Sequence, residues 1–446
     1  MRKSAIMKYC DLIVKGGEVF TPSGLERIDL SINDGKISGM GNLVTAEANE
    51  VINASGLTVL PGIIDTHVHF REPGLEHKES IYHGCRAAAK GGVTTIFEMP
   101  NTLPPTVSEI DLNCKLARSK ANTWCDHAYF IGATQENIHT LRNLELSSGC
   151  AGIKVFMGSS TGCLLMNDDE LLAKVLNNGK RRIAIHAEDD DILRKREQIA
   201  KICGHSRAHP IWRSTDSALK ATQRIIRLNR QSERLLHMLH ISCAEEIEFL
   251  SEHKEIATVE ATINHLTMVG PECYERLGSL AQINPPVRTQ KHQKALWAAI
   301  ADCTIDVIGS DHAPHTLEEK QLPYPSSPSG LPGVQTMLPL LLDHMNAGRL
   351  TLARLVDLTS AGPHRVYGIL GKGRIVKGWD ADLTLVDLNA KREITNKWID
   401  SKCGWTPFDG KMVIGWPIAT VLRGNIIMRD DELIGTALGK PARFIQ

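Results

Sequence analysis

Through the long middle of the chain, strand-like apolar runs alternate with amphipathic helical segments. Short apolar runs of the kind that form buried strands recur there, and segments with helical periodicity separate most of them. The strand-like runs lie at residues 62–69, 94–99, 128–131, 152–157, 182–186, 236–241, 256–262 and 304–309. The clearest helical segments lie at residues 79–90, 108–120, 168–177, 214–229 and 291–301. Eight strands alternating with helices predict an α/β fold, a (β/α)8 barrel of the TIM type.

The two ends of the chain have a different sequence pattern, with short β-like runs and tight turns. The β-like runs lie at residues 11–14, 28–32, 36–38, 382–387 and 419–422. We therefore expect a small β domain formed from both chain ends, residues 1–60 and 371–446, beside a barrel of residues 61–370. Residues 322–332 are rich in Pro and Ser and are predicted to form a loop that is mobile without ligand.

Composition limits the partners and the location that we expect. Lys plus Arg and Asp plus Glu both number 51, so charge gives no reason to expect nucleic acid or an anionic membrane as partner. No stretch approaches the roughly 18 apolar residues of a membrane helix. The 11 cysteines include no CxxC pair, which favours reduced thiols. The opening MRKSAIMKYCDLIVKGG lacks a signal-peptide core, so we expect a cytoplasmic protein.

Candidate metal ligands gather at the ends of the predicted strands, which form the catalytic face of a barrel. His67 and His69 end the first strand, and residues i and i+2 of a strand point to the same side. Lys154 stands in the apolar run GIKVFM, where a lysine is costly to bury unless it is paired, deprotonated or modified. Three further strand ends carry His186, His240 and Asp311.

Each of these features has a simpler explanation when taken alone. Two histidines can be satisfied by hydrogen bonds, and a lysine at a strand edge can extend its amine to solvent. The coincidence of four histidines, one lysine and one aspartate at corresponding strand ends favours a metal site instead. Imidazole and carboxylate are ligands that zinc accepts readily.

Several motifs resemble those of dihydroorotases in the amidohydrolase superfamily. They are HVHFREPG at 67–74, GGVTTIFEMPNTLPP at 91–105, GSDHAPHT at 309–316 and PSGLPGVQT at 328–336. They occur in the expected order over nearly the whole chain. The resemblance implies two divalent metal ions, expected to be Zn2+, with His67, His69 and Asp311 at the more buried ion and His186 and His240 at the other. It also implies that Lys154 carries a CO2-derived carbamate bridging the metals; some bacterial members have aspartate there.

The same resemblance implies the activity. L-Dihydroorotate would be hydrolysed reversibly to N-carbamoyl-L-aspartate, with cyclisation as the biosynthetic direction in de novo pyrimidine biosynthesis. A hydroxide held between the metals would attack the ring amide, with Asp311 as general base and acid. Arg71 offers a two-pronged fork for the substrate carboxylate. By the resemblance, Asn101 and His315 would share that carboxylate and Asn284 would contact the pyrimidine ring.

Alternatives stay open at this stage. An allantoinase or a hydantoinase/dihydropyrimidinase-like cyclic amidase would use similar metal ligands, but its substrate lacks the carboxylate that Arg71 would bind. A catalytically inactive scaffold of the same fold is a rival of another class, and the intact ligand set argues against it. A homodimer is expected from the family only, and association with an aspartate transcarbamoylase stays open.

Several other polar residues near the predicted strand ends receive different expectations. Glu260, in VEAT at the end of the seventh strand, either supports a metal ligand, binds an extra metal or is structural. Cys243 is expected to pack at a helix start. The histidines expected to be hydrogen-bonded structural residues are His265, His312 and His364.

Overall fold

A ring of parallel strands lies at the centre of the computed structural model, which describes residues 9–158 and 162–445. The ring strands are β8 (Ile63–Val68), β9 (Val93–Glu98), β10 (Asp126–Gly132), β11 (Cys150–Phe156), β12 (Ile183–His186), β13 (Leu236–Met238), β14 (Ala257–Thr262) and β15 (Val307–Gly309). They pair in chain order. The ring closes where Val68 bridges His312 and the His69 amide donates to the His312 carbonyl at 2.7 Å. The predicted barrel is confirmed.

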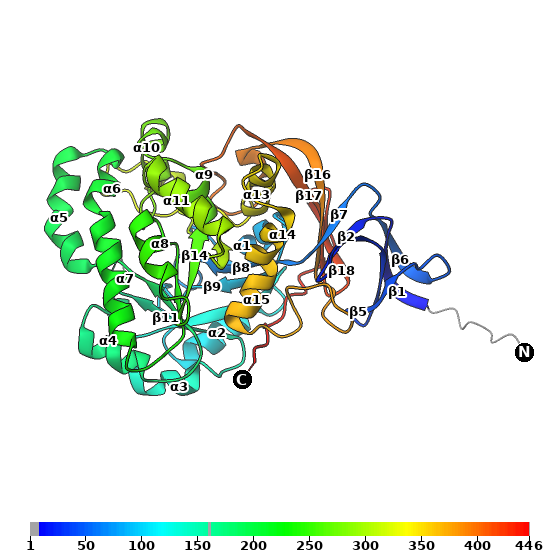
Figure 1. The fold of residues 1–446 in the computed structure, drawn as a ribbon, viewed down its shortest axis with the longest axis horizontal. Coiled ribbons are helices and arrows are strands. Elements are labelled where there is room, and N and C mark those ends of the chain that lie inside the picture. The colour runs from blue at the N-terminus through cyan, green and yellow to red at the C-terminus, as the bar shows by residue number, and fades with distance from the viewer. Residues whose placement is uncertain (1–8, 159–161, 446) are drawn as a thin grey trace, which may run out of the picture.

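Helices surround this ring (Figure 1). The helices that match predicted segments to within two residues are α1 (Ile81–Lys90), α2 (Glu109–Ser119), α4 (Asp169–Leu176), α7 (Thr215–Asn229) and α11 (Gln290–Ala301). Their starts follow from local chemistry, because the side chains of Ser80, Ser108 and Asp168 accept from backbone amides of the first turn.

The other α-helices complete the barrel connections. They are α3 (Leu141–Leu144), α5 (Asp190–Cys203), α6 (His209–Trp212), α8 (Ala244–Ser251), α9 (Ile263–Thr267), α10 (Glu272–Leu277), α12 (Leu317–Lys320), α13 (Met337–Asn346), α14 (Leu352–Val356) and α15 (Gly362–Tyr367). None of the helices among the described residues is both long and apolar enough to cross a membrane.

Strands from both chain ends form two sheets beside the barrel (Figure 1). One sheet has the order β5-β4-β1-β6 and the other the order β19-β18-β17-β16-β7-β2-β3. Their bounds are β1 (Tyr9–Lys15), β2 (Glu18–Thr21), β3 (Gly24–Arg27), β4 (Asp29–Asn33), β5 (Lys36–Gly41), β6 (Glu47–Asn53), β7 (Thr58–Pro61), β16 (Leu383–Ile394), β17 (Lys411–Leu422), β18 (Asn425–Arg429) and β19 (Glu432–Leu433).

Strand β7 joins the two ends of the chain, since it pairs antiparallel with β16 and parallel with β2. Leu12 and Ile32 from the first end share one apolar core with Leu383 and Val421 from the last end. A small β domain formed from both ends is therefore confirmed, while the boundaries at residues 60/61 and 370/371 stay predictions. The two long strands β16 and β17 extend well beyond the predicted runs at 382–387 and 419–422.

Two smaller expectations can be compared with the structure. All 11 cysteines lie within the described residues and are free. The loop at 322–332 is more constrained than its composition suggests, because the buried Lys320 amine donates to the carbonyls of Pro328 at 2.8 Å and Gly330 at 3.1 Å. Its mobility stays a prediction. Residues 1–8, which carry part of the signal-peptide expectation, lie outside the described residues.

Candidate active site

A cavity of about 90 Å³ opens at the carboxyl ends of the barrel strands. Its lining residues are His67, His69, Arg71, Asn101, Lys154, Phe156, His186, His240, Asn284, Asp311, Ala313, Ser329 and Gly330. All the site residues predicted from the sequence lie there except His315. Arg71, His240 and Asp311 have positive backbone φ angles of 63°, 37° and 47°, a conformation that non-glycine residues seldom adopt and whose strain can be stored at functional sites.

The first group of candidate ligands is His67, His69 and Asp311. Oδ1 of Asp311 lies 3.3 Å from Nε2 of His67 and 3.2 Å from Nε2 of His69. Nδ1 of His67 lies 2.7 Å from Oε1 of Glu260, and Nδ1 of His69 lies 2.6 Å from Oδ1 of Asn101. These acceptors favour a proton on each Nδ1, which leaves both Nε2 lone pairs turned toward Asp311 for a cation.

The charge of Asp311 suits a ligand. Burial raises the pKa of Asp311, but the adjacent His67 and His69 lower it further, so the net shift is below the usual value. Asp311 is therefore a carboxylate at neutral pH. It can accept a proton or bind a cation.

The second group is His186, His240 and Lys154. Nδ1 of His186 lies 2.9 Å from Nε2 of His240, and burial lowers the pKa of both imidazoles. Nε2 of His186 lies 2.8 Å from Oε2 of Glu188, whose Oε1 accepts from Arg213 Nε at 3.0 Å. This arrangement fixes the ring of His186 with Nδ1 facing the cavity.

Lys154 is buried without a polar partner. Its amine Nζ has no hydrogen-bond partner among the described residues, and neither does Nδ1 of His240. The Phe156 ring centroid lies 4.6 Å from this amine, and burial lowers the pKa of Lys154 to about 7. Buried polar atoms are nearly always satisfied in proteins, so an orphaned amine among histidines and a carboxylate fits a site completed by a bound group.

Glu260 connects the two groups. Its Oε1 lies near His67 Nδ1 and accepts from the backbone amide of His240 at 3.2 Å. Oε2 lies 3.6 Å from Nε2 of His237. Burial raises the pKa of Glu260, but His67 and His237 lower it far more, so the carboxyl is ionised. Among the roles left open by the sequence, this geometry favours support of a metal ligand.

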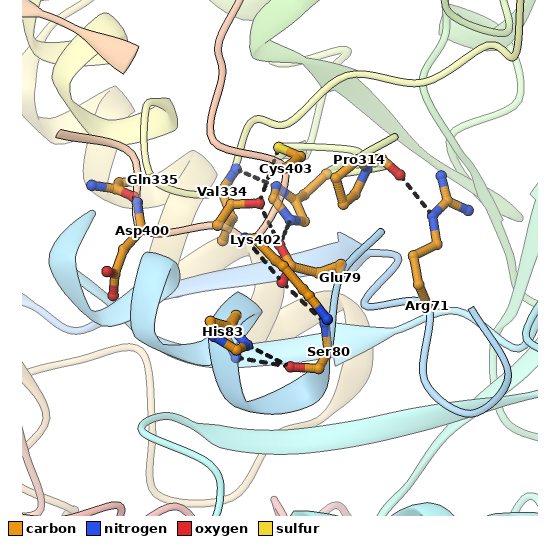
Figure 2. Close-up of polar contacts among 12 residues, drawn as sticks. Arg71, Glu79, Ser80, His83, Pro314, Val334, Gln335, Asp400, Lys402 and Cys403 are labelled. Atoms are coloured by element: carbon orange, nitrogen blue, oxygen red, sulfur yellow. Dashed lines mark hydrogen bonds and ion pairs between the residues drawn. The ribbon is translucent and has the colours of Figure 1, made fainter. Parts of the chain in front are cut away.

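The Arg71 guanidinium forms one wall of the cavity. Its Nε donates to the Pro314 carbonyl at 3.1 Å, as Figure 2 shows, and one terminal nitrogen lies 3.2 Å from Nε2 of His315. Within residues 9–158 and 162–445, no carboxylate forms an ion pair with Arg71. Burial lowers the pKa of Arg71 only to about 10, so the guanidinium keeps its charge at neutral pH.

The remaining predicted substrate residues are held by protein contacts. His315 contacts Arg71 but does not line the cavity, and its Nε2 lies 3.1 Å from the Ser329 carbonyl. Asn101 contacts His69, and Oδ1 of Asn284 lies 2.9 Å from Nε2 of His209. The structure thus gives Asn101 a contact with a candidate metal ligand that the sequence did not predict.

Residues predicted to be structural have protein partners. Cys243 is the N-cap of α8, and Nδ1 of His364 lies 2.7 Å from the Ile369 carbonyl. Nε2 of His265 lies 3.0 Å from the Pro285 carbonyl, and Nδ1 of His312 accepts from the Gly333 amide at 3.1 Å. These contacts confirm a hydrogen-bonded role for each histidine.

Sequence reasoning missed the supporting layer around the ligands. Glu188 follows His186 by two positions in IAIHAED, and this spacing was an available signal. Arg213 and His209 lie far from the strand ends in sequence, and only the fold brings them to the site.

A second acidic cluster lies away from the cavity and is already neutralised. Asp126, Asp380 and Asp382 place carboxylate oxygens close together. The amine of Lys372 lies 2.5 Å from oxygens of Asp126 and Asp382 and 3.3 Å from one of Asp380. The lysine occupies the place that a cation would take, so this cluster is an internal salt bridge.

Comparison with known proteins places the chain in a family. Residues 58–427 match the amidohydrolase family. The chain belongs to this family. Among relatives of this amidohydrolase, a protein of Methanosarcina acetivorans named dihydroorotase is 35% identical over 95% of this chain and 93% of its own. One of the same name from Halobacterium salinarum is 36% identical over 91% of this chain and 94% of its own.

Solved structures show the same fold. The L-hydantoinase (dihydropyrimidinase) of Arthrobacter aurescens superposes with a TM-score of 0.92 and 27% identity, covering 97% of this amidohydrolase and 99% of its own chain. The dihydropyrimidinase of Brevibacillus agri gives a TM-score of 0.90 and 26% identity, with 97% and 99% covered. The fold alone therefore does not separate the two activities.

Proposed function

We propose that this amidohydrolase is a dihydroorotase, which hydrolyses L-dihydroorotate reversibly to N-carbamoyl-L-aspartate and closes the ring in the biosynthetic direction. The names of its relatives support this choice. The observation that carries it is Arg71, a buried guanidinium at the cavity wall without an ion pair among the described residues. Burying a cation of this kind without a counter-charge is costly, and the carboxylate of dihydroorotate supplies one.

The hydantoinase alternative lacks such a counter-charge on the ring. Hydantoin, allantoin and dihydrouracil carry the cyclic amide without a ring carboxylate. An inactive scaffold would have no use for an ionised Asp311 beside His67 and His69. Both alternatives therefore leave buried charges of this cavity without a role.

We propose two divalent metal ions, expected to be Zn2+, as cofactors. His67, His69 and Asp311 would hold one, and His186 and His240 the other. The orphaned Nζ of Lys154 fits a carbamate formed by CO2 on this amine, because carbamylation turns a buried, unpaired base into an anion that can bridge two cations. When bound, the metals would lower the pKa of a water molecule and polarise the ring carbonyl.

The chain's own residues would orient the substrate and move the proton. Arg71 would bind the carboxylate at one end of the ring, which places the scissile amide toward the histidine cluster. Asp311 would take the proton that the attacking water releases and pass it to the leaving ring nitrogen. Asn284, oriented through His209, would contact the ring. The four histidines proposed as metal ligands need to stay neutral to bind the metals.

The carboxylate contact is tested by replacing Arg71 with methionine. The apparent kcat/KM for L-dihydroorotate should fall about 30-fold to several thousand-fold, since loss of one partner of a desolvated charged pair costs roughly 2–5 kcal/mol. The inhibition constant of dihydrouracil, which has the ring without the carboxylate, should change little. Arg71→Lys should recover part of the loss, because lysine lacks the planar fork.

Arg142, an exposed residue remote from the cavity lining, offers a matched control as Arg142→Met, which should behave as the unmodified enzyme. Equal weakening of dihydroorotate and dihydrouracil in Arg71→Met would show that Arg71 supports the structure of the site, and the choice of dihydroorotase over hydantoinase would lose its physical basis.

We also propose a cytoplasmic location. The free state of all 11 cysteines supports a reducing compartment.

A further inference from the structure

The connection between β16 and β17 leaves the β domain and lies against the mouth of the barrel. We call residues 396–410 the rim segment. Ser401, Trp405 and Thr406 in this segment are buried, with exposed fractions of 4%, 1% and 4%. A connection between two strands of a hairpin normally runs over the surface, so this burial indicates that the rim segment has a specific docking place on the barrel.

The first docking contact is the carboxylate of Glu79, which lies just before α1 and is fully buried. It accepts from the Ser401 hydroxyl and from the Lys402 backbone amide at 3.3 Å. Its Oε2 also lies 3.4 Å from Nε2 of His312. Figure 2 shows Glu79 between Ser80 and Lys402. Glu79 thus joins the rim segment to the residue that follows Asp311.

A second contact lies beside the first. The side-chain amide of Gln335 donates to the Trp398 carbonyl at 2.7 Å, and its oxygen accepts from the Asp400 amide at 2.9 Å. Figure 2 shows Gln335 against Asp400. The nitrogen and the oxygen of the Gln335 side chain are thus both bonded to the rim segment, and this pair of contacts fixes the position of the segment on the barrel.

The third contact leads to the cavity. The Trp405 indole Nε1 donates to the His315 backbone carbonyl at 2.8 Å. His315 Nε2 lies 3.2 Å from a terminal nitrogen of Arg71, and the carbonyl of the preceding Pro314 accepts from Arg71 Nε at 3.1 Å. Both of these polar contacts of Arg71 therefore come from residues 314–315, and Trp405 donates a hydrogen bond to the last carbonyl of this stretch.

We propose that the rim segment is part of the substrate-selecting machinery and that Trp405 is a positioning residue for Arg71. This inference rests on the proposed function, because it concerns the group that would bind the substrate carboxylate. The β domain would then act on specificity through the Trp405 hydrogen bond, which the contacts of the rim segment with Glu79 and Gln335 would hold in place. The Trp405 indole N–H donates to His315 and not to a candidate metal ligand, so the geometry of those ligands should not depend on it.

Trp405→Phe tests the proposal, since phenylalanine keeps an aromatic ring and removes the N–H. We expect KM for L-dihydroorotate to rise about 5- to 10-fold, as for loss of one buried hydrogen bond. We expect kcat to stay within about twofold and both the metal content and the dihydrouracil inhibition constant to stay unchanged.

Trp297 provides the matched control, because its Nε1 donates to the Leu266 carbonyl at 3.1 Å and not to the stretch that contacts Arg71. Trp297→Phe should leave KM unchanged. Ser401→Ala, which removes one hydrogen bond to Glu79, should raise KM in the same direction by a smaller factor, and it serves as the test if Trp405→Phe does not fold.

Crystal structures of the variants make the positional claim independent of activity. The proposal expects Arg71 to leave the Pro314 carbonyl in Trp405→Phe. It is overturned if Arg71 keeps its contacts there, if KM does not change, or if kcat falls and dihydrouracil binding weakens along with the rise in KM. If the unmodified enzyme does not turn over dihydroorotate, the proposed function fails, and the Arg71 position still decides whether Trp405 positions it.

Discussion

Replacing Glu260 with glutamine should weaken metal binding about tenfold. Oε1 of Glu260 lies 2.7 Å from Nδ1 of His67 and accepts from the His240 amide at 3.2 Å, so one oxygen supports proposed ligands of both metals. Glutamine keeps the shape and one acceptor oxygen but loses the charge. Hydrogen bonds to charged groups are worth roughly 1 to 1.5 kcal/mol more than neutral ones, and 1.4 kcal/mol corresponds to about tenfold, at the lower end of the 10- to 100-fold usual for partners of metal ligands.

The affinity can be measured by titrating metal-free protein with Zn2+ in competition with a chelator, and kcat can be measured at saturating metal. Glu246 is a matched control, because its buried carboxylate accepts from Thr222 at 3.0 Å and lines no part of the cavity. Glu246→Gln should bind metal as the unmodified enzyme does. Unchanged metal affinity in Glu260→Gln would refute the view that Glu260 supports the ligands.

Three further predictions concern the proton carrier, the bridge and acid stability. Asp311→Asn should lose about 10²–10⁴-fold in kcat even when fully metallated, and near-normal turnover would contradict its role. Lys154→Ala should lose activity that short carboxylic acids partly restore; mass spectrometry of active enzyme showing only unmodified Lys154 would contradict the carbamate. Burial lowers the pKa of His127 from 6.5 to about 4. Between these two pH values the unfolded chain takes up a proton that the folded protein does not, so the free energy of unfolding decreases as the pH falls from 6.5 to about 4. His127→Gln should remove about 2 kcal/mol of that loss at pH 5, seen as a smaller difference in melting temperature between pH 7 and pH 5; an unchanged difference would rule this out.

Local pattern was enough to predict the barrel and to group the candidate ligands that line its cavity. The HxH spacing grouped His67 in β8 with His69 just beyond the end of that strand, and the cost of burying an amine singled out Lys154, whose Nζ has no hydrogen-bond partner among the described residues. Strand ends are local features, and a barrel brings them together whatever the details of the helices. This is why residues far apart in sequence could be grouped from the sequence alone.

The supporting contacts depend on three-dimensional register and could not be predicted in the same way. Glu260 contacts His67 only because the barrel brings β14 and β8 together on either side of β15. Trp405 reaches His315 through a segment between two strands of the β domain. Neither contact leaves a periodic signal, since each depends on how a distant segment docks.

The strands of the β domain were also predicted incompletely. β16 (Leu383–Ile394) and β17 (Lys411–Leu422) extend as a long hairpin from which the rim segment projects. Their inner halves are buried at nearly every position, whereas their outer halves alternate between more and less exposed positions, and register shifts interrupt the pairing. The predicted runs at 382–387 and 419–422 therefore marked only the continuously buried parts of these strands.

The most direct test of the proposed activity is steady-state turnover by the purified, metal-analysed protein, with L-dihydroorotate and hydantoin compared under the same conditions. We predict two metal ions per chain and a kcat/KM for L-dihydroorotate at least about 100-fold above that for hydantoin, because a buried group built to pair with a substrate charge discriminates strongly against a ring without it. Preference for hydantoin, or no turnover of L-dihydroorotate by protein holding two metals, would contradict the assignment.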